Sequence, residues 1–170
     1  CDFYSHPGER GVPEAYVDAL LRELSRFAPE APLQPDTLYF GGGTPSLLRP
    51  EQAKRLIDAA RPMPGAEITL EANPETVTEE SLAGFREAGV NRISFGVQSA
   101  RDTQLRTLGR PHTAKQARAA FAAAQRAGFT NISGDIMLAL PHYTEAEFDE
   151  TLELIEGDRK STRLNSSHQL

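Results

Sequence analysis

Polar side chains that could bind a small molecule recur where extended segments end. Glu71 ends the extended segment 67–71, Gln98 ends 92–98, and Asp135 lies inside 132–140. A buried polar group without a partner costs roughly 1–3 kcal/mol. Three such groups together would cost several kcal/mol, so we predict that a polar ligand or water satisfies them. For any single residue, an internal hydrogen-bond network is the alternative.

A glycine-rich loop, residues 41–45 (GGGTP), follows the extended segment 37–40. Three glycines let a ligand approach the main chain closely, and their N–H groups can bind an anion or a carboxylate. A tight turn between a strand and a helix explains the same residues, so the loop alone leaves both interpretations open.

Two hydrophobic periodicities alternate along the chain. Apolar residues with helical spacing fall in five main segments, with a short helical stretch around Leu105 and Leu108: about 13–27, 53–60, 78–89, 113–128 and 144–157. Extended segments lie between them: 37–40, 67–71, 92–98 and 132–140. The order is that of an α/β protein.

The spacing of the extended segments predicts a parallel sheet. They begin at residues 37, 67, 92 and 132, which are 30, 25 and 40 residues apart, and units of that length are joined by right-handed crossovers. We interpret the fold as a section of a (β/α) barrel. A doubly wound sheet is the alternative, but the chain has no G-x-G-x-x-G sequence to support it.

One face of each strand is expected to be polar. Ile93, Phe95 and Val97 alternate with Ser94, Gly96 and Gln98, and Ile68 and Leu70 alternate with Thr69 and Glu71. Helices must cover the apolar face, so the polar face, with Asp135, is expected to point into the barrel. A purely structural barrel would fill that space with Val, Ile and Leu.

Composition narrows the class of protein. The 170 residues include 18 Lys and Arg against 24 Asp and Glu, a net charge of −6, which argues against binding nucleic acid through its phosphates. A single cysteine excludes an internal disulfide and suits a reducing compartment, so we expect a cytoplasmic protein. No apolar run is long enough to predict a membrane span.

The two ends are expected to be unnatural. The chain opens at Cys1 instead of Met, so we expect a start that lies upstream or was removed. Residues 158–170 resemble a translated sequencing adapter, and we predict one domain over 1–157 followed by a non-native tail. A genuine disordered polar tail is the alternative.

Six motifs in order resemble the radical S-adenosylmethionine (radical SAM) family. They are residues 1–5 (CDFYS), 41–45 (GGGTP), 71–74 (EANP), 94–99 (SFGVQS), 108–110 (LGR) and 135–141 (DIMLALP). Within that family they are most similar to the oxygen-independent coproporphyrinogen III oxidase group, and there to its heme chaperone branch. The resemblance implies a partial (β/α)6 TIM-like barrel from which the first and last strands are missing.

The resemblance also implies cofactors. Family members hold a [4Fe-4S] cluster on three cysteines, bind S-adenosylmethionine to its open iron, and use one electron to generate a 5′-deoxyadenosyl radical. Cys1 matches the third cysteine, and the first two would lie upstream, so we do not expect this chain by itself to hold the cluster. The positions matching contacts to S-adenosylmethionine are Gly42, Gly43 and Thr44 at its amino group, Glu71 as a carboxylate, and Gln98, Arg110 and Asp135 as further contacts.

One position separates the two branches of the group. The oxidases carry another cysteine two residues after the third cluster ligand, and Phe3 stands there. This favours a chaperone that binds heme and delivers it to hemoproteins. The alternatives are an enzyme, either the oxidase that decarboxylates coproporphyrinogen in porphyrin biosynthesis or another radical enzyme, and a plain anion-binding barrel domain.

The resemblance also suggests partners. We expect a tetrapyrrole, a recipient hemoprotein and an electron donor. His6, His112 and His142 are candidate heme ligands by side-chain type alone.

Overall fold

The computed structural model describes residues 11–27, 34–138, 140, 144–156 and 162–167. Its α-helices are α1 (Glu14–Phe27), α2 (Pro50–Ala60), α3 (Glu79–Ala88), α4 (Asp102–Thr107), α5 (Ala114–Arg126) and α6 (Glu145–Glu156). Its strands are β1 (Thr37–Phe40), β2 (Glu67–Ala72), β3 (Arg92–Gln98), β4 (Ile132–Met137) and β5 (Thr162–Ser167). Two 3₁₀ turns, η1 (Pro45–Leu47) and η2 (Pro74–Thr76), follow β1 and β2.

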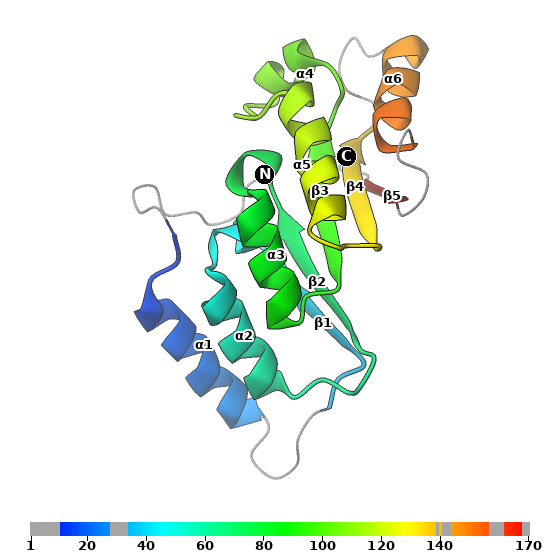
Figure 1. The fold of residues 1–170 in the computed structure, drawn as a ribbon. Coiled ribbons are helices and arrows are strands. Elements are labelled where there is room, and N and C mark those ends of the chain that lie inside the picture. Colours follow the sequence, from blue (N-terminus) through cyan, green and yellow to red (C-terminus); the bar gives the residue numbers. More distant parts are fainter. Residues whose placement is uncertain (1–10, 28–33, 139, 141–143, 157–161, 168–170) are drawn as a thin grey trace.

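The sheet has the strand order β1-β2-β3-β4-β5, and every neighbouring pair is parallel. Each strand therefore lies beside the strand before it, with no reversal of direction along the sheet (Figure 1). A doubly wound sheet needs such a reversal. The α/β fold and its winding as a section of a barrel are confirmed.

The structure differs from expectation at the carboxyl end of the chain. Thr162–Ser167, inside the tail excluded from the predicted fold, pair with β4 from Ile132 to Met137. The edge of β4 presents main-chain N–H and C=O groups to which an extended segment can bond without specific side chains. The adapter origin of residues 158–170 stays a prediction. The predicted strand 132–140 also ends earlier, at Met137, because the apolar run to Leu140 does not itself mark where pairing stops.

Local signals set the helix boundaries. Thr78 accepts a hydrogen bond from Ser81 N and Ser81 bonds back, and Thr113 and Gln116 form the same reciprocal cap on α5. Gly89 ends α3 with a left-handed φ of 113°, which glycine adopts without steric cost. These caps position the helices over the sheet.

The core lies between the sheet and its helices. Leu70, Ile93 and Phe95 of the strands are fully buried against the helices, where the rings of Phe95 and Phe121 lie 5.1 Å apart. Figure 1 shows α2, α3 and α5 along this face. The opposite face of β2, β3 and β4 is polar, as the alternation predicts. In the described part of the chain, no helix is long and apolar enough to cross a membrane.

The contact between α2 and α3 depends on Gly84. A Cβ at this position would lie 2.6 Å from Cγ of Pro50, the rigid first residue of α2. We expect Gly84→Ala to lower the free energy of unfolding by about 1–2 kcal/mol, because overpacking exceeds the gain in helix propensity of about 1 kcal/mol. Urea unfolding measures this. Glu80→Ala, on the exposed side of α3, should change stability by less than about 0.5 kcal/mol. A Gly84→Ala protein more stable than the wild type would contradict the packing described.

Candidate cofactor-binding site

The parallel register brings the predicted binding residues to one edge of the sheet. Glu71 pairs with Ser94, and Gly96 pairs with Asp135. The loop that begins at Gly41 follows the end of β1, the strand beside β2. The carboxyl ends of parallel strands are where barrel proteins bind their ligands.

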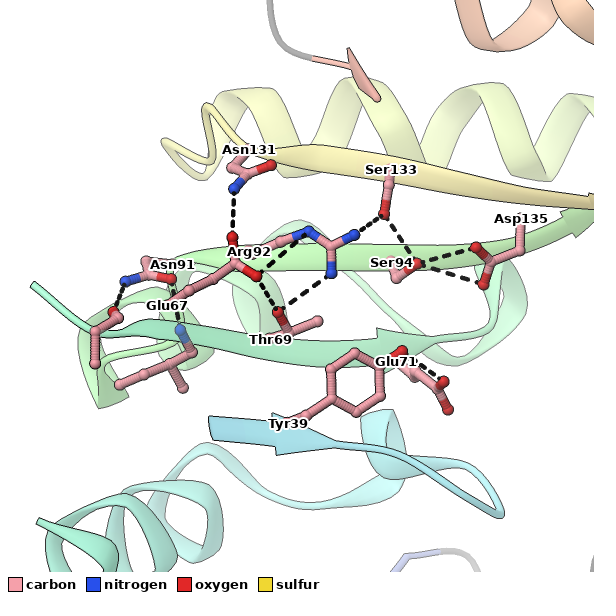
Figure 2. A network of polar contacts seen from close by, with 12 residues as sticks. Tyr39, Glu67, Thr69, Glu71, Asn91, Arg92, Ser94, Asn131, Ser133 and Asp135 are labelled. Atoms are coloured by element: carbon pink, nitrogen blue, oxygen red, sulfur yellow. Dashed lines mark hydrogen bonds and ion pairs between the residues drawn. The ribbon is translucent and has the colours of Figure 1, made fainter. Parts of the chain in front are cut away.

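Glu71 ties the glycine loop to the sheet. Its Oε2 accepts a hydrogen bond from Gly42 N at 3.2 Å, and its Oε1 accepts one from the Tyr39 hydroxyl at 2.7 Å. Figure 2 shows Tyr39 and Glu71 meeting across β1 and β2. A Cβ on Gly41 would lie 2.8 Å from Cε1 of the Tyr39 ring, so this glycine makes room for the ring.

The described residues leave one side of the loop open. Gly42 and Gly43 have left-handed φ values of 78° and 55°, and apart from their own chain neighbours no atom of the described residues lies within 4 Å of the place a Cβ would take on either. Thr44, half-buried, follows them and precedes η1 without capping it through its side chain. The loop therefore leaves main-chain groups accessible to a ligand.

Tyr39 is a neutral donor at physiological pH. Burial is the largest cause that raises the pKa of its hydroxyl well above the ordinary value, and the hydrogen bond to Glu71 and the charges of Glu71 and Asp135 raise it further. The ring itself stays 57% exposed. Tyr39 holds the Glu71 carboxylate while presenting an aromatic surface beside the loop.

A buried arginine organises the polar face of the sheet. The Arg92 guanidinium donates to Thr69 Oγ1 at 3.2 Å and to Ser133 Oγ at 2.9 Å, and its Nε lies 4.0 Å from Glu67. The side chain is 11% exposed. Ser133 is 2.9 Å from Ser94 Oγ, so the hydroxyls continue the network along the strands (Figure 2).

Asp135 ends this network. Burial raises the pKa of its carboxyl above the ordinary value, and the Glu71 charge acts in the same direction. The hydrogen bond from Ser94, 3.4 Å to each carboxylate oxygen, and the Arg92 charge oppose that rise. Asp135 is half-buried. Two carboxylates on one polar face favour a ligand with a cationic group and hydroxyl donors.

Gln98 has an unusual backbone. Its φ is 66°, and Ser99 N donates to Val97 O at 2.8 Å, which makes Gln98 the centre of a γ-turn of the rare type with positive φ. The pairing of β3 with β4 is irregular between Gly96 and Gln98. A Cβ on Gly96 would lie 3.2 Å from the Gln98 amide nitrogen, so this glycine makes room for the amide.

Arg110 lies beyond α4, with its N–H donating to Leu105 O at 2.8 Å. Its charge is among the causes that lower the pKa of Glu75, which lies in η2. The structure thus brings Glu71 of β2 together with Gly42 of the loop after β1, places Asp135 on the same polar face in β4, and places Arg110 in the segment after α4.

The histidines divide into two groups. His6 and His142, like Cys1, lie outside the described residues. His112 is described: its side chain is 0% exposed, with one ring nitrogen at Val97 O and the other facing Glu75, and a heme role for any of the three candidate histidines stays a prediction. Among the described residues no three His, Cys, Asp or Glu side chains form a group that could hold a metal.

Sequence reasoning missed four residues of this region. Tyr39 and Arg92 alternate in phase with the polar residues of their strands, so period-two spacing could have found them. Ser133, two residues before Asp135, carried the same signal. Glu75 carried none, because its partner His112 is 37 residues away along the chain.

Comparison with known families identifies the superfamily to which the chain belongs. Residues 1–155 match the model of the Radical SAM superfamily. The chain belongs to this superfamily. The family implies S-adenosylmethionine and a [4Fe-4S] cluster as cofactors.

Radical SAM relatives include curated heme chaperones. The chain is 39% identical over 175 residues to heme chaperone HemW of Escherichia coli (strain K12), covering 99% of this chain and 44% of that protein. It is 37% identical over 159 residues to heme chaperone HemW of Bacillus subtilis (strain 168), covering 89% and 42%. The chain therefore spans less than half the length of these relatives.

A solved radical SAM enzyme has a similar structure. Coproporphyrinogen III oxidase (HemN) from Escherichia coli matches with a TM-score of 0.75 and 28% identity, covering 92% of this chain and 38% of that one. An archaeal Elp3 from Methanocaldococcus infernus matches with a TM-score of 0.62 at 17% identity, covering 90% and 41%, which supports the fold alone.

The raised pKa of Asp135 gives a prediction for this radical SAM domain. Because folding favours its protonated form, the ionised carboxyl costs stability above its folded pKa, and the cost disappears as pH falls below its unfolded value of about 3.9. We expect Asp135→Asn, whose amide oxygen still accepts from Ser94, to be more stable than the wild type in urea at pH 7.5. The difference should shrink toward pH 4.

The matched control is Asp58→Asn on the exposed face of α2. Asp58 pairs with Lys54 at 2.9 Å, so its loss should lower stability by no more than about 0.5 kcal/mol. An Asp135→Asn protein that is less stable than the wild type at both pH values would show that ionised Asp135 stabilises the empty site.

Proposed function

We propose that this chain is the S-adenosylmethionine-binding core of a heme chaperone that also carries a [4Fe-4S] cluster. The observation that carries the proposal is the anchoring of Glu71 to both Gly42 N and the Tyr39 hydroxyl, directly beneath an open glycine loop. Asp135 lies on the same face of the sheet. The heme function rests on the similarity to the HemW chaperones.

The donor set fits S-adenosylmethionine. The molecule carries an amino group, a sulfonium cation and ribose hydroxyls, and these are the partners that two carboxylates bind. Its own carboxylate would be bound by main-chain N–H groups of the open loop and by Arg110. In this proposal Gly42, Gly43 and Thr44 hold the amino-acid end, and Glu71, Gln98, Arg110 and Asp135 complete the site.

The residues of the chain bind and orient. When bound, S-adenosylmethionine and the cluster supply one-electron radical chemistry, which no protein side chain here could provide. Glu71 keeps the loop in place through Gly42 N, and Tyr39 excludes water from one side of that carboxylate. Asp135 has a raised pKa, so a cationic or hydroxyl donor that binds it also stabilises its ionised form.

The cluster needs cysteines that this chain does not have. The family uses three, and this chain has one, Cys1, which lies outside the described residues. We therefore assign the cluster to a full-length protein carrying this segment, with Cys1 supplying one thiolate. The electron donor and recipient hemoprotein belong to the same proposal, as does a cytoplasmic location, which suits reduced thiols.

A second function has its own support. The structural match to coproporphyrinogen III oxidase covers 92% of this chain at 28% identity, so an oxidase that decarboxylates coproporphyrinogen is the alternative. Phe3 disfavours it, because the oxidases have cysteine at that position.

The binding site is tested by Glu71→Gln in the full-length protein, reconstituted anaerobically with iron and sulfide. The amide oxygen can still accept from Tyr39, but the amide nitrogen cannot accept from Gly42 N, and the side chain lacks charge. Loss of one charged hydrogen bond is worth roughly 1.5–3 kcal/mol, so affinity for S-adenosylmethionine should fall at least about tenfold by calorimetry. Glu80→Gln, exposed on α3, should bind like the wild type. Equal affinity in Glu71→Gln and wild type would remove Glu71 from the site.

The chaperone and oxidase functions are separated by titrating the same protein with heme and by assaying it with coproporphyrinogen III. We expect a heme-dependent Soret band and no decarboxylated product. Product formation without heme binding would overturn the chaperone proposal in favour of the oxidase. A protein that takes up no iron would contradict the cluster.

A further inference from the structure

A buried histidine and a half-buried glutamate that the proposed site does not use face each other. His112 Nδ1 is 3.3 Å from Glu75 Oε2, with the two side chains 0% and 21% exposed. Within the described part of the chain, neither atom has a partner with hydrogen-bond geometry, so each is the nearest polar group available to the other. The pair joins η2, after β2, to the segment that follows α4.

The contacts of the His112 ring define its hydrogens. Its Nε2 lies 3.1 Å from Val97 O, and a carbonyl oxygen only accepts, so Nε2 carries a hydrogen. Its Nδ1 faces the Glu75 carboxylate, which also only accepts when ionised. The ring nitrogen Nδ1 and the carboxylate oxygen are within ion-pair distance of each other.

Glu75 is held in its ionised form. Burial alone would raise the pKa of its carboxyl, but contact with the His112 ring, a main-chain hydrogen bond and the charges of His112 and Arg110 outweigh burial and lower it. The groups around the ring are thus Glu75 from η2, Val97 O from β3, and Arg110 from its own segment.

The carbonyl that His112 holds belongs to the strained turn. Val97 O accepts from both His112 Nε2 and Ser99 N, and Gln98 lies between them with its positive φ. A non-glycine residue in such a conformation costs about 1–3 kcal/mol and persists only where its surroundings enforce it. His112 is one enforcing contact, and it comes from outside the strand.

The His112–Glu75 pair also restricts Arg110, another residue predicted to contact S-adenosylmethionine. Arg110 is two residues before His112, and its charge reaches Glu75. Anchoring His112 between Val97 and Glu75 therefore restricts the segment that carries Arg110 relative to β3.

We propose that the His112–Glu75 pair is a positioning device that holds Gln98 in its γ-turn and fixes the segment carrying Arg110 relative to β3, so that both residues meet S-adenosylmethionine together. The proposal rests on the function proposed above. Neither His112 nor Glu75 touches the ligand in it.

The test compares four variants of the reconstituted full-length protein: His112→Gln, Glu75→Gln, the double variant, and Leu82→Ala. Leu82 is buried in α3, so its truncation lowers stability without touching the pair. Affinity for S-adenosylmethionine should fall about tenfold in His112→Gln, as when side chains that support metal ligands are removed. Leu82→Ala should bind within about twofold of the wild type.

The double variant separates positioning from stability. In His112→Gln alone, the amide oxygen faces an ionised carboxylate. With Glu75→Gln as well, the amide at position 75 can donate to the amide oxygen at position 112, and the amide at position 112 can donate to Val97 O. The double variant should therefore bind S-adenosylmethionine more tightly than His112→Gln alone. Equal losses in Leu82→Ala and His112→Gln, or no recovery in the double variant, would overturn the proposal.

A second readout needs no ligand. In NMR spectra of the 170-residue chain, the main-chain signals of Gln98 and Ser99 should shift in His112→Gln and stay in place in Leu82→Ala. If the wild type binds no S-adenosylmethionine but the Gln98 and Ser99 signals shift in His112→Gln, the proposed function is wrong and the contact of His112 still positions Gln98. If the wild type binds and neither signals nor affinity change, the positioning proposal fails.

Discussion

Burial of the Arg92 charge is the constraint on which the polar face depends. A guanidinium only donates, so each hydroxyl beside it must accept and then donate its own hydrogen onward. Ser133 accepts from Arg92 and donates to Ser94, which donates to Asp135. From Ser133 the donors run toward the carboxyl ends of the strands, while Thr69, which also accepts from Arg92, donates to Glu67 at 3.4 Å. Polar groups deep in the sheet are thus satisfied internally, and the acceptors left with capacity are at the site.

Several features of the site lower the stability of the folded protein, and a bound ligand would offset that loss. Burial and the Glu71 charge raise the pKa of Asp135. The hydrogen bond from Ser94 and the Arg92 charge act against them but do not offset them. Gln98 keeps a φ of 66°, and one side of the loop at Gly42 and Gly43 has no close neighbour among the residues that the structure describes. Such features lower the free energy of unfolding of the protein without a ligand. A cationic ligand with hydroxyl donors would compensate the carboxylates and fill the open loop, so the same residues explain both the cost and the affinity.

Much of this arrangement could be predicted from the sequence, because its signals are local. Strands 37–40 and 92–98 and the caps at Thr78 and Thr113 follow from spacing and residue type within a few positions. The polar face follows from alternation. The turn at Gln98 could not be predicted, because glutamine rarely adopts a positive φ and its presence does not indicate one. The pairing of His112 with Glu75 and of β5 with β4 joins distant segments, and only tertiary structure decides such contacts.

Rigid and open parts of the site come from different elements. Glu71, Ser94 and Asp135 lie on paired strands, whose register fixes their spacing. The glycine loop has one described side-chain tie, Gly42 N to Glu71, so the carboxylate that would meet the ligand also sets the loop's distance from the sheet. Each oxygen of Glu71 accepts one described hydrogen bond and keeps a lone pair for a ligand, so a cation can bind without displacing Gly42 or Tyr39, but a carboxylate that moved toward the ligand would draw the loop with it. The loop and the carboxylate must therefore respond to a ligand as one unit, while β2, β3 and β4 stay fixed beneath them.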